Sequence, residues 1–422
     1  MPNIPIRGEM WKLAYAPEAT YGTDPGTIYY VNVLGVVQTG VMPDPEIELW
    51  PIWALGTASK RNWYITYKGK ITLAGSIPDV WLLNGASMRW PIGVCGTVGA
   101  DVSGGGGSTL SEDSARGATT ITIASITGYA ANDYIQVDIG SNAEVRQITN
   151  ISGNILTLNY PLSYAHSSGA TCNEVTVPYT HTIIEANTLD SLAMHLTIND
   201  ADGNIELMRR FLGGKVNRAT YVATEGEQLR MSFDELVFID WAHNQSGEPK
   251  YNSDIADITP SYPTTEPYLF SYGALSLAGT SFARIRAFRL EVTNNAEAKY
   301  YVNYVAGISQ LPTEYREGRR EYRLSCTVDI EDASLYKDLI RQGTYSAIYK
   351  GFQTLLVFTR GSNDTITFTI PSTIPAAGGN AMGCLIRSAK HNIVDAPLVS
   401  TDLDIISRNL QIVVVDAVPV YP

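Results

Sequence analysis

The stretch that decides the fold reads RIRAFRLEVTNN from Arg284 and, after a polar loop, EGRREYRLSCTVDIE up to Glu331. Both flanks alternate apolar and polar residues with the two-residue period of a β-strand. The alternation slips once, between Arg286 and Phe288, which predicts a β-bulge at that point. The loop between the flanks is longer than a tight turn, so we expect it to form a contact surface.

A second segment, from Lys215 to Phe238, follows the same plan and reads KVNRATYVATEGEQLRMSFDELVF. In both segments Glu-Gly precedes a strand that begins apolar-Arg-apolar-Ser, LRMS over 229–232 and YRLS over 322–325. The sequence therefore predicts two related β-halves of one body.

Length and composition indicate a mainly β protein. The chain has 422 residues with 36 glycines, 21 prolines and 25 tyrosines but only 17% charged residues, a balance typical of short strands joined by turns. The formal net charge of −12 argues against a protein that grips DNA or RNA by neutralising phosphates, because that needs clustered lysine and arginine.

Cysteine usage and hydropathy bear on the compartment. Four widely separated cysteines (Cys95, Cys172, Cys326 and Cys384) show no Cys-x-x-Cys spacing, so we expect reduced, buried thiols. No apolar run reaches the ~20 residues needed to cross a bilayer, and the first fifteen residues lack the apolar core of a signal peptide. We expect no membrane anchor and folding in a reducing, soluble compartment.

A composition break marks a predicted insert. Gly104, Gly105, Gly106 and Gly107 form a flexible link, and no Trp, Phe or Lys occurs between 108 and 173 although strand signals follow closely there. We therefore expect an acidic β module over 104–173, hinged at the four glycines. The main β domain would be discontinuous, over 1–103 and 174–422.

Other patterns predict particular elements. The clearest helix runs from Ala333 to Gln342, with Asp332 as its N-cap and Gly343 after its end. A helical turn is expected over Ile205–Leu212, and a hairpin over 354–358 and 365–370. Six of the seven tryptophans fall between Trp11 and Trp90, which favours a role in the core or in a subunit interface over a carbohydrate platform.

The sequence offers no anchor for catalysis or for a bound metal or cofactor. The five histidines are scattered without metal-binding or triad spacing. The segment from Asp200 to Asn204 resembles the start of a calcium loop, but its glycine comes two positions early and Phe211 stands where a bidentate glutamate is needed. A plain hairpin turn is favoured. No glycine-rich stretch follows a strand and opens a helix, so phosphate binding is not supported.

The strand alternation divides the paired strands into two faces. The side expected to face the core carries Met231, Phe233, Leu324, Cys326, Val328 and Ile330. The opposite side then carries Arg230, Ser232, Asp234, Arg323, Ser325, Thr327, Asp329 and Glu331. This polar face is either solvated or lines something that the protein encloses when it assembles.

Several segments resemble the tail tube proteins of long-tailed bacteriophages. They are EATYGT from Glu18, FLGGKVN from Phe211 leading into EGEQL, FRLEVTNN from Phe288, and PTEYREG from Pro312. They occur in order across about 350 of the 422 residues. Within the insert, DYIQV from Asp133 and ISGNILT from Ile151 resemble small β modules that decorate phage virion proteins, although the simplest tube proteins lack such an insert.

The resemblance implies a β-sandwich or barrel with a short flanking helix, assembled as hexameric rings that stack into a hollow tube. Neighbouring subunits would join strands into one inner barrel, and DNA would pass through a lumen of acidic character without specific binding. The partners would be further copies and other tail proteins, in a virion made in the host bacterial cytoplasm, with the insert outside.

Two sets of residues follow from this reading. The candidate lumen-facing residues are Arg230, Ser232, Asp234, Glu291, Arg323, Asp329 and Glu331. The candidates for an inter-subunit or inter-ring loop are Asn294, Asn295, Tyr300, Tyr315 and Arg316. Two alternatives remain open, a distal-tail or baseplate ring of the same fold and a carbohydrate-binding β protein suggested by the tryptophans and acids.

Overall fold

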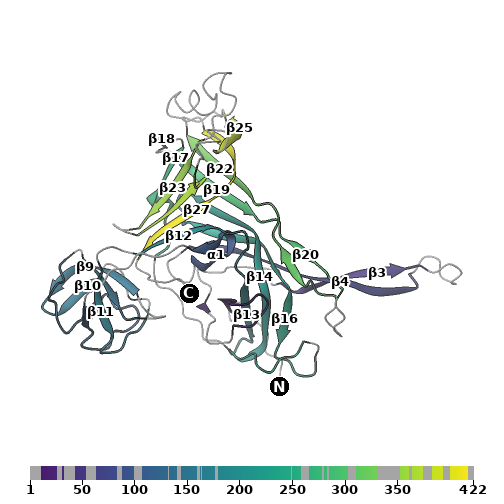
Figure 1. Ribbon diagram of the computed structural model, residues 1–422, viewed down its shortest axis with the longest axis horizontal. Helices are drawn as coiled ribbons and strands as arrows, with labels where there is room; N and C mark the ends of the chain where they lie inside the picture. The colour runs from purple at the N-terminus through teal and green to yellow at the C-terminus, as the bar shows by residue number, and fades with distance from the viewer. Residues whose placement is uncertain are drawn as a thin grey trace.

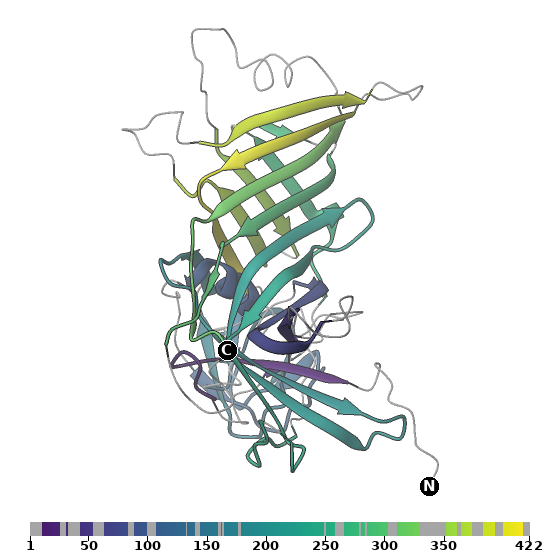
Figure 2. The same ribbon diagram turned by 90° about the vertical axis from the view of Figure 1, so that its right-hand side faces the viewer.

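The computed structural model describes residues 11–25, 31–32, 43–53, 63–82, 88–98, 107–131, 133–139, 144–158, 162, 164–175, 179–248, 250–257, 266–277, 280–282, 285–302, 310–329, 352–360, 364–373, 383–392 and 400–416. These residues form a mainly β fold built of antiparallel strand pairs, arranged in three large sheets and one two-stranded ribbon (Figures 1 and 2).

The largest sheet contains both halves predicted from the sequence. One of its rows, which we call the long sheet, runs β3-β4-β15-β14-β19-β22-β26-β25. The bounds are β3 Pro45–Ile52, β4 Ile65–Trp81, β15 Arg230–Phe238, β14 Ile205–Thr224, β19 Ile285–Thr293, β22 Glu321–Asp329, β26 Ser400–Ser407 and β25 Leu385–Asn392. The two halves lie side by side, since β14 pairs with both β15 and β19.

The register between β19 and β22 confirms the predicted β-bulge. Ile285 lies opposite Val328 and Ala287 lies opposite Thr327, so Arg286 is an extra residue in β19. A bulge of this kind redirects the strand and leaves one side chain outside the regular alternation.

Strand β14 bends because it belongs to two parts of the sheet. Its first half pairs with β13 (Leu192–Asn199) and β16 (Asp240–His243), and β13 is followed outward by β1 (Lys12–Pro17) and β2 (Val31–Asn32). The helical turn predicted over Ile205–Leu212 is therefore wrong. Strands on both sides take its backbone hydrogen bonds, and this tertiary pairing overrides local preference.

A second sheet packs against the long sheet to make a sandwich. Its order is β18-β17-β23-β24-β27-β12-β5. The bounds are β18 Thr280–Phe282, β17 Gly273–Leu277, β23 Thr354–Thr359, β24 Thr365–Ile370, β27 Gln411–Asp416, β12 Tyr179–Glu185 and β5 Gly96–Val98. The predicted hairpin over 354–358 and 365–370 is confirmed as β23 and β24, which pair in register.

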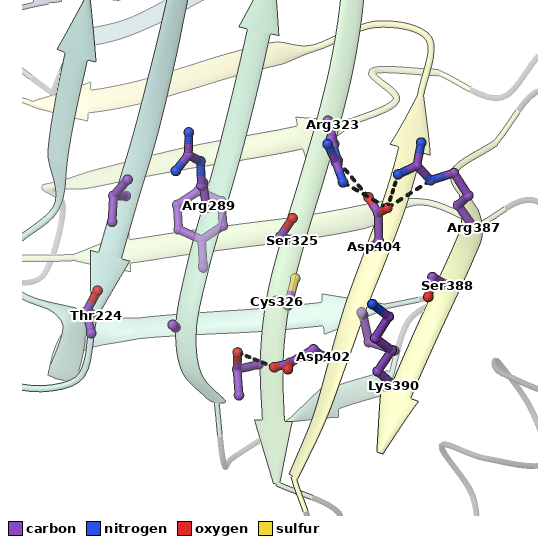
Figure 3. A pocket seen from close by; sticks show the side chains of 15 residues that line it. Thr224, Arg289, Arg323, Ser325, Cys326, Arg387, Ser388, Lys390, Asp402 and Asp404 are labelled. Carbon is purple, nitrogen blue, oxygen red and sulfur yellow. Dashed lines mark hydrogen bonds and ion pairs between the residues drawn. The ribbon is translucent and has the colours of Figure 1, made fainter. Parts of the chain in front are cut away.

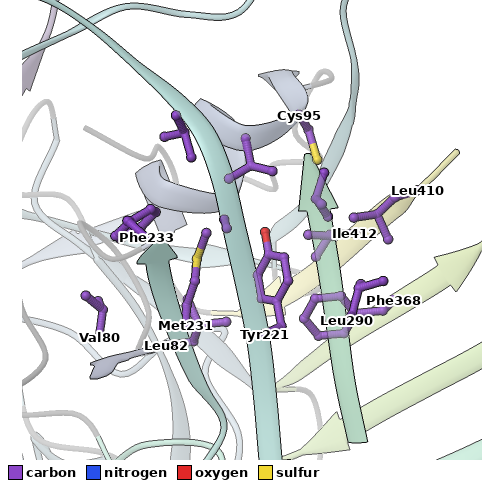
Figure 4. Close-up of a cluster of buried hydrophobic side chains, with 14 of the residues drawn as sticks. Val80, Leu82, Cys95, Tyr221, Met231, Phe233, Leu290, Phe368, Leu410 and Ile412 are labelled. Atoms are coloured by element: carbon purple, nitrogen blue, oxygen red, sulfur yellow. The ribbon is translucent and has the colours of Figure 1, made fainter. Parts of the chain in front are cut away.

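Aromatic side chains from both sheets meet in the core (Figure 4). The ring centroids of Tyr221 and Phe368 lie 5.2 Å apart, and those of Phe288 and Phe358 lie 6.4 Å apart. The predicted core residues Met231, Phe233, Leu324, Cys326 and Val328 are at most 2% exposed, which confirms their orientation, while Ile330 lies outside the described residues. Truncating one such aromatic ring to alanine typically costs about 3–5 kcal/mol.

Residues 107–175 form a third sheet of six strands with a core of its own. The order is β6-β11-β8-β9-β10-β7. The bounds are β6 Gly107–Thr109, β11 Thr171–Val175, β8 Tyr134–Val137, β9 Glu144–Ser152, β10 Ile155–Leu158 and β7 Thr120–Thr122. The strands that come first and last along the chain, β6 and β11, pair with each other. In Figure 1 this sheet lies beside the sandwich.

The helical content is small. Helix α1 (Arg89–Cys95) ends at Gly96, whose φ of 115° places it in the left-handed region and whose N–H bonds to the Ile92 carbonyl. A 3-10 turn covers Phe270–Tyr272. The short ribbon consists of β20 (Glu297–Lys299) and β21 (Glu314–Arg316). The predicted helix over Ala333–Gln342 lies outside the described residues.

Candidate assembly surfaces

The polar side chains of the long sheet gather on its outer side. Successive side chains of a strand point to opposite faces, so burial of Met231 and Leu324 turns their neighbours away from the core. We call the outer side of β15, β14, β19, β22, β26 and β25 the charged face, which Figure 2 views broadside. Its charged members include Arg218, Arg230, Asp234, Arg289, Glu291, Arg323, Asp329, Arg387, Lys390, Asp402 and Asp404.

One carboxylate on this face holds two arginines from the strands on either side (Figure 3). Asp404 on β26 accepts a 3.0 Å hydrogen bond from Nε of Arg323 on β22 and a 2.8 Å bond from Nε of Arg387 on β25. The hydrogen bond from Arg323, helped by the charge of Arg387, lowers the pKa of Asp404 against a smaller opposing effect of burial. The carboxylate therefore stays ionised and links three strands across the face.

A groove of about 490 Å³ lies on the charged face around this group. Its charged lining residues are Arg289, Arg323, Arg387, Lys390, Asp402 and Asp404. Four bases line this groove against two acids, although Asp404 pairs with Arg323 and Arg387. The acidic character that the family resemblance implies for a lumen is therefore not what this groove displays.

The structure brings six of the candidate lumen-facing residues onto this one face. Asp234 accepts bonds from Thr220 at 2.6 Å and from Ser232 at 3.2 Å, and Arg230 pairs with Glu227. A carboxyl oxygen of Glu291 lies 3.7 Å from Arg289 Nη2. A carboxyl oxygen of Asp329 lies 3.4 Å from Arg286 Nε. Glu331, the seventh candidate, lies outside the described residues.

Strands β3 and β4 form a hairpin that projects from the body (Figure 1). We call residues 49–53 and 63–68 the tongue. Pairing of β4 with β15 starts only at Leu73, so within the described chain the tongue has no third strand. Its large apolar side chains are between 40% and 67% exposed: Leu49, Trp50, Ile52, Trp53, Trp63, Tyr64, Ile65 and Tyr67. The tryptophans among them are therefore not core residues of the monomer, which leaves the subunit-interface alternative that the sequence offered. The sequence did not show that they gather on one hairpin.

The predicted contact loop over 294–316 folds back on its own chain as the β20–β21 ribbon, which we call the arm. Asn294 is 1% exposed and donates to the Val94 and Val216 carbonyls, and Tyr315 is 4% exposed. These two residues are thus interior, and their assignment to a contact surface is corrected. Asn295, Tyr300 and Arg316 are exposed, as expected of a loop surface.

The segments that carry the family resemblance converge behind the arm. Lys215 Nζ lies 2.6 Å from a carboxyl oxygen of Glu317, 3.0 Å from the Tyr315 carbonyl oxygen and 4.7 Å from the Tyr21 ring centre. Burial raises the pKa of Glu317, but the bond from Lys215 and backbone N–H groups outweigh it, so the pKa is lowered. Glu18 accepts the Gly213 N–H at 2.8 Å in the same region. These motifs therefore build a structural junction.

The glycine junction of the third sheet differs from a free hinge at its inner end. Gly107 lies in β6 opposite Asn173, and a Cβ there would lie 2.7 Å from the Asn173 amide oxygen. Tyr179 of β12 donates a 2.6 Å hydrogen bond to Gln136 of β8, so this sheet contacts the sandwich through a side chain. Gly104, Gly105 and Gly106 lie outside the described residues.

Reactive groups in the described chain serve structural roles. Burial raises the pKa of Cys95, Cys172 and Cys326 to about 12, and all four cysteines are free and buried, which confirms the expected buried thiols. Asp200 accepts backbone N–H groups at 2.8–2.9 Å within a β13–β14 hairpin turn, which confirms the plain turn. Among described residues no His, Cys, Asp and Glu cluster is arranged to hold a metal, and no helix is long and apolar enough to span a bilayer.

Comparison with known families identifies the class of protein. A family model described as phage tail tube protein matches residues 11–384, nearly the whole chain. The chain therefore belongs to the phage tail tube proteins, a structural and non-enzymatic family of the virion tail whose members assemble with themselves and with other tail proteins. A search of curated proteins finds no match.

Proposed function

We propose that this protein forms hexameric rings that stack into a hollow tail tube through which DNA is ejected. One observation carries the proposal: within the described chain the long sheet ends in two edge strands, β3 and β25. Unpaired edges invite pairing with another chain, and closure into a barrel removes them. Pairing between β25 of one subunit and β3 of the next would join six long sheets into one wall.

Electron microscopy of the purified protein tests this function. The expected result is rings with six-fold symmetry at low concentration and hollow tubes at high concentration. A protein that remains a monomer under every condition would overturn the proposal. A single ring that never stacks would favour the alternative of a distal-tail or baseplate ring, and glycan binding by the monomer would favour the carbohydrate-binding alternative.

In this tube the charged face lines the lumen, with Arg230, Ser232, Asp234, Glu291 and Arg323 facing the passing duplex. Asp329, only 9% exposed, is buried and does not reach the duplex. The support is electrostatic, because ion pairs such as Arg323–Asp404 offset the arginines that would otherwise hold phosphates. Replacing both Asp402 and Asp404 with Asn removes two negative charges from the groove. These tubes should retain more DNA in co-sedimentation at low salt than wild-type tubes do, and equal retention would contradict the lumen assignment.

The six-stranded sheet is an inserted domain that decorates the outside of the tube. Two observations support this: residues 107–175 have a hydrophobic core of their own, and β6 pairs with β11, so the two ends of the insert lie side by side. Deleting 107–175 should leave tubes that form at the same protein concentration but have a smaller outer diameter. Loss of assembly in a deletion variant that still folds would show that the insert is part of the ring contact.

A further inference from the structure

The tongue has one face made entirely of apolar side chains. In the β3–β4 register Trp50 lies opposite Tyr67 and Ile52 lies opposite Ile65, so these four side chains share one face. They are 40–53% exposed in the chain. The other face is mixed, because Leu49 lies opposite Lys68 and Pro51 lies opposite Thr66. We call the apolar side the docking face of the tongue.

We propose that this docking face, with the Trp53–Trp63 pair at the end of the tongue, seats on a second copy of the same chain. The proposal rests on the assembly proposed above and names the element that makes one of its contacts. The centroids of Trp53 and Trp63 lie 6.2 Å apart, so the two indoles are neighbours where the described part of the hairpin ends. Tyr64, 67% exposed, follows directly.

The exposed area matches what a specific protein contact requires. The docking face and the Trp53–Trp63 pair comprise six large apolar side chains, four of them aromatic and roughly half exposed, which present on the order of 600 Å². This is comparable to the ~800 Å² that each partner contributes to a specific interface. Exposed apolar patches of this size on a soluble protein usually mark an interaction site. An isolated two-stranded hairpin is also marginally stable in water, so docking would supply the third layer that it lacks.

The base of the tongue is held by the arm of the same chain. Gln310 donates a 3.1 Å hydrogen bond to the Lys68 carbonyl, and Ile71 donates its N–H to the Gln310 carbonyl at 2.7 Å. The Tyr300 hydroxyl donates to the Ile71 carbonyl at 3.2 Å. These bonds fix the backbone just behind the exposed residues. A supported tongue loses less conformational freedom on binding than a free loop, which favours a specific contact.

The occupant is a second copy because of stoichiometry. Every subunit carries a tongue, so every subunit needs an acceptor, and the family assembles with itself. A tongue that seats on a different surface of the next copy makes a heterologous contact, which generates closed rings or open stacks. A minor tail protein present in few copies cannot cover the tongue of each subunit.

Two adjacent residues of β4 allow a matched test. Tyr67 lies on the docking face and Thr66 on the mixed face, and both are exposed. We expect Tyr67→Lys to raise the protein concentration needed for assembly by on the order of 30-fold or more, as for a central contact residue. Thr66→Lys adds the same charge one residue away and should change that concentration less than about 3-fold. Equal effects of the two substitutions would overturn the proposal.

Cross-linking identifies the occupant and separates this inference from the proposed function. A photo-reactive phenylalanine analogue at position 53 should cross-link to a second copy in wild-type-like tubes, as mass spectrometry of mixed isotope-labelled chains would show. If tubes form but position 53 cross-links only within its own chain, or gives no protein cross-link, the docking role is overturned while the proposed function stands. Failure of the wild-type protein to assemble would instead count against the proposed function. The thermal unfolding curve of each variant monomer checks that folding is preserved.

Discussion

The tongue and the charged face are both exposed parts of the long sheet, but they satisfy their side chains in opposite ways. On the charged face Asp404 holds Arg323 and Arg387 within the chain. On the tongue Trp50 and Tyr67 stand side by side with half of their surface in solvent. A face whose charges are paired internally can remain wet, whereas exposed apolar rings gain free energy only when something covers them. The charged face therefore needs no partner to satisfy its side chains, whereas the tongue gains free energy when another surface covers it.

The largest effect on the folded chain should come from removing the support behind the arm, which holds the base of the tongue. Lys215→Met leaves the Glu317 carboxylate without its buried cation, and breaking such a pair from one side costs about 3 kcal/mol. The expected result is a lower free energy of unfolding of the monomer, measured by chemical denaturation, together with weaker assembly. Lys70→Met is the control, because its ammonium lies in the open, 5.9 Å from the Tyr300 ring centre. Equal losses from both changes would contradict the junction described here.

A change at the end of the tongue should weaken assembly without affecting folding. Trp53→Ala removes a large aromatic contact residue, so association should lose about 2 kcal/mol while the monomer keeps its unfolding free energy. Sedimentation velocity across a concentration series measures the first quantity. Tyr272→Ala is matched in exposure but lies on the sandwich, and it should leave association unchanged. If Tyr272→Ala weakens association as much as Trp53→Ala does, the tongue is not a specific contact surface.

The smallest effect should come from the charged face. Asp404→Asn removes ion pairs that are partly exposed, so the free energy of unfolding should fall by about 1 kcal/mol at pH 7 while assembly is unchanged. Because the folded-state pKa of Asp404 is lowered, its contribution is present above the unfolded pKa of about 4 and is lost as pH falls through the folded pKa. The difference between wild type and Asp404→Asn should therefore shrink in acid. A difference that stays constant from pH 7 to pH 2 would rule out this pairing.

Much of the sandwich could be predicted from sequence because strand alternation is a local signal. The pattern around Phe288 and Leu324 predicted the strands, the inward residues and the bulge at Arg286. The same reasoning predicted a helical turn before Gly213, because periodicity over eight residues does not reveal that strands will pair on both sides.

The candidate surfaces were harder to predict, because exposure depends on which strands lie next to each other. The sequence placed Trp50 either in the core or in a subunit interface. It lies in solvent because β4 pairs with β15 only from Leu73 onward, which no local signal reveals. The sequence predicted Asn294 as an exposed loop residue, but its side-chain amide is buried and donates to the Val94 and Val216 carbonyls. Alternation did place Arg323 and Asp329 on one face, but no local signal showed that Asp404, far along the chain, would join them.

A cryo-electron microscopy reconstruction of the assembled protein would show directly which surfaces are covered. We expect stacked six-fold rings in which Trp50 and Tyr67 are buried against a neighbouring subunit and Arg323 and Asp404 line the channel. A tube in which the tongue stands in solvent, or in which the charged face is buried between subunits, would contradict this expectation.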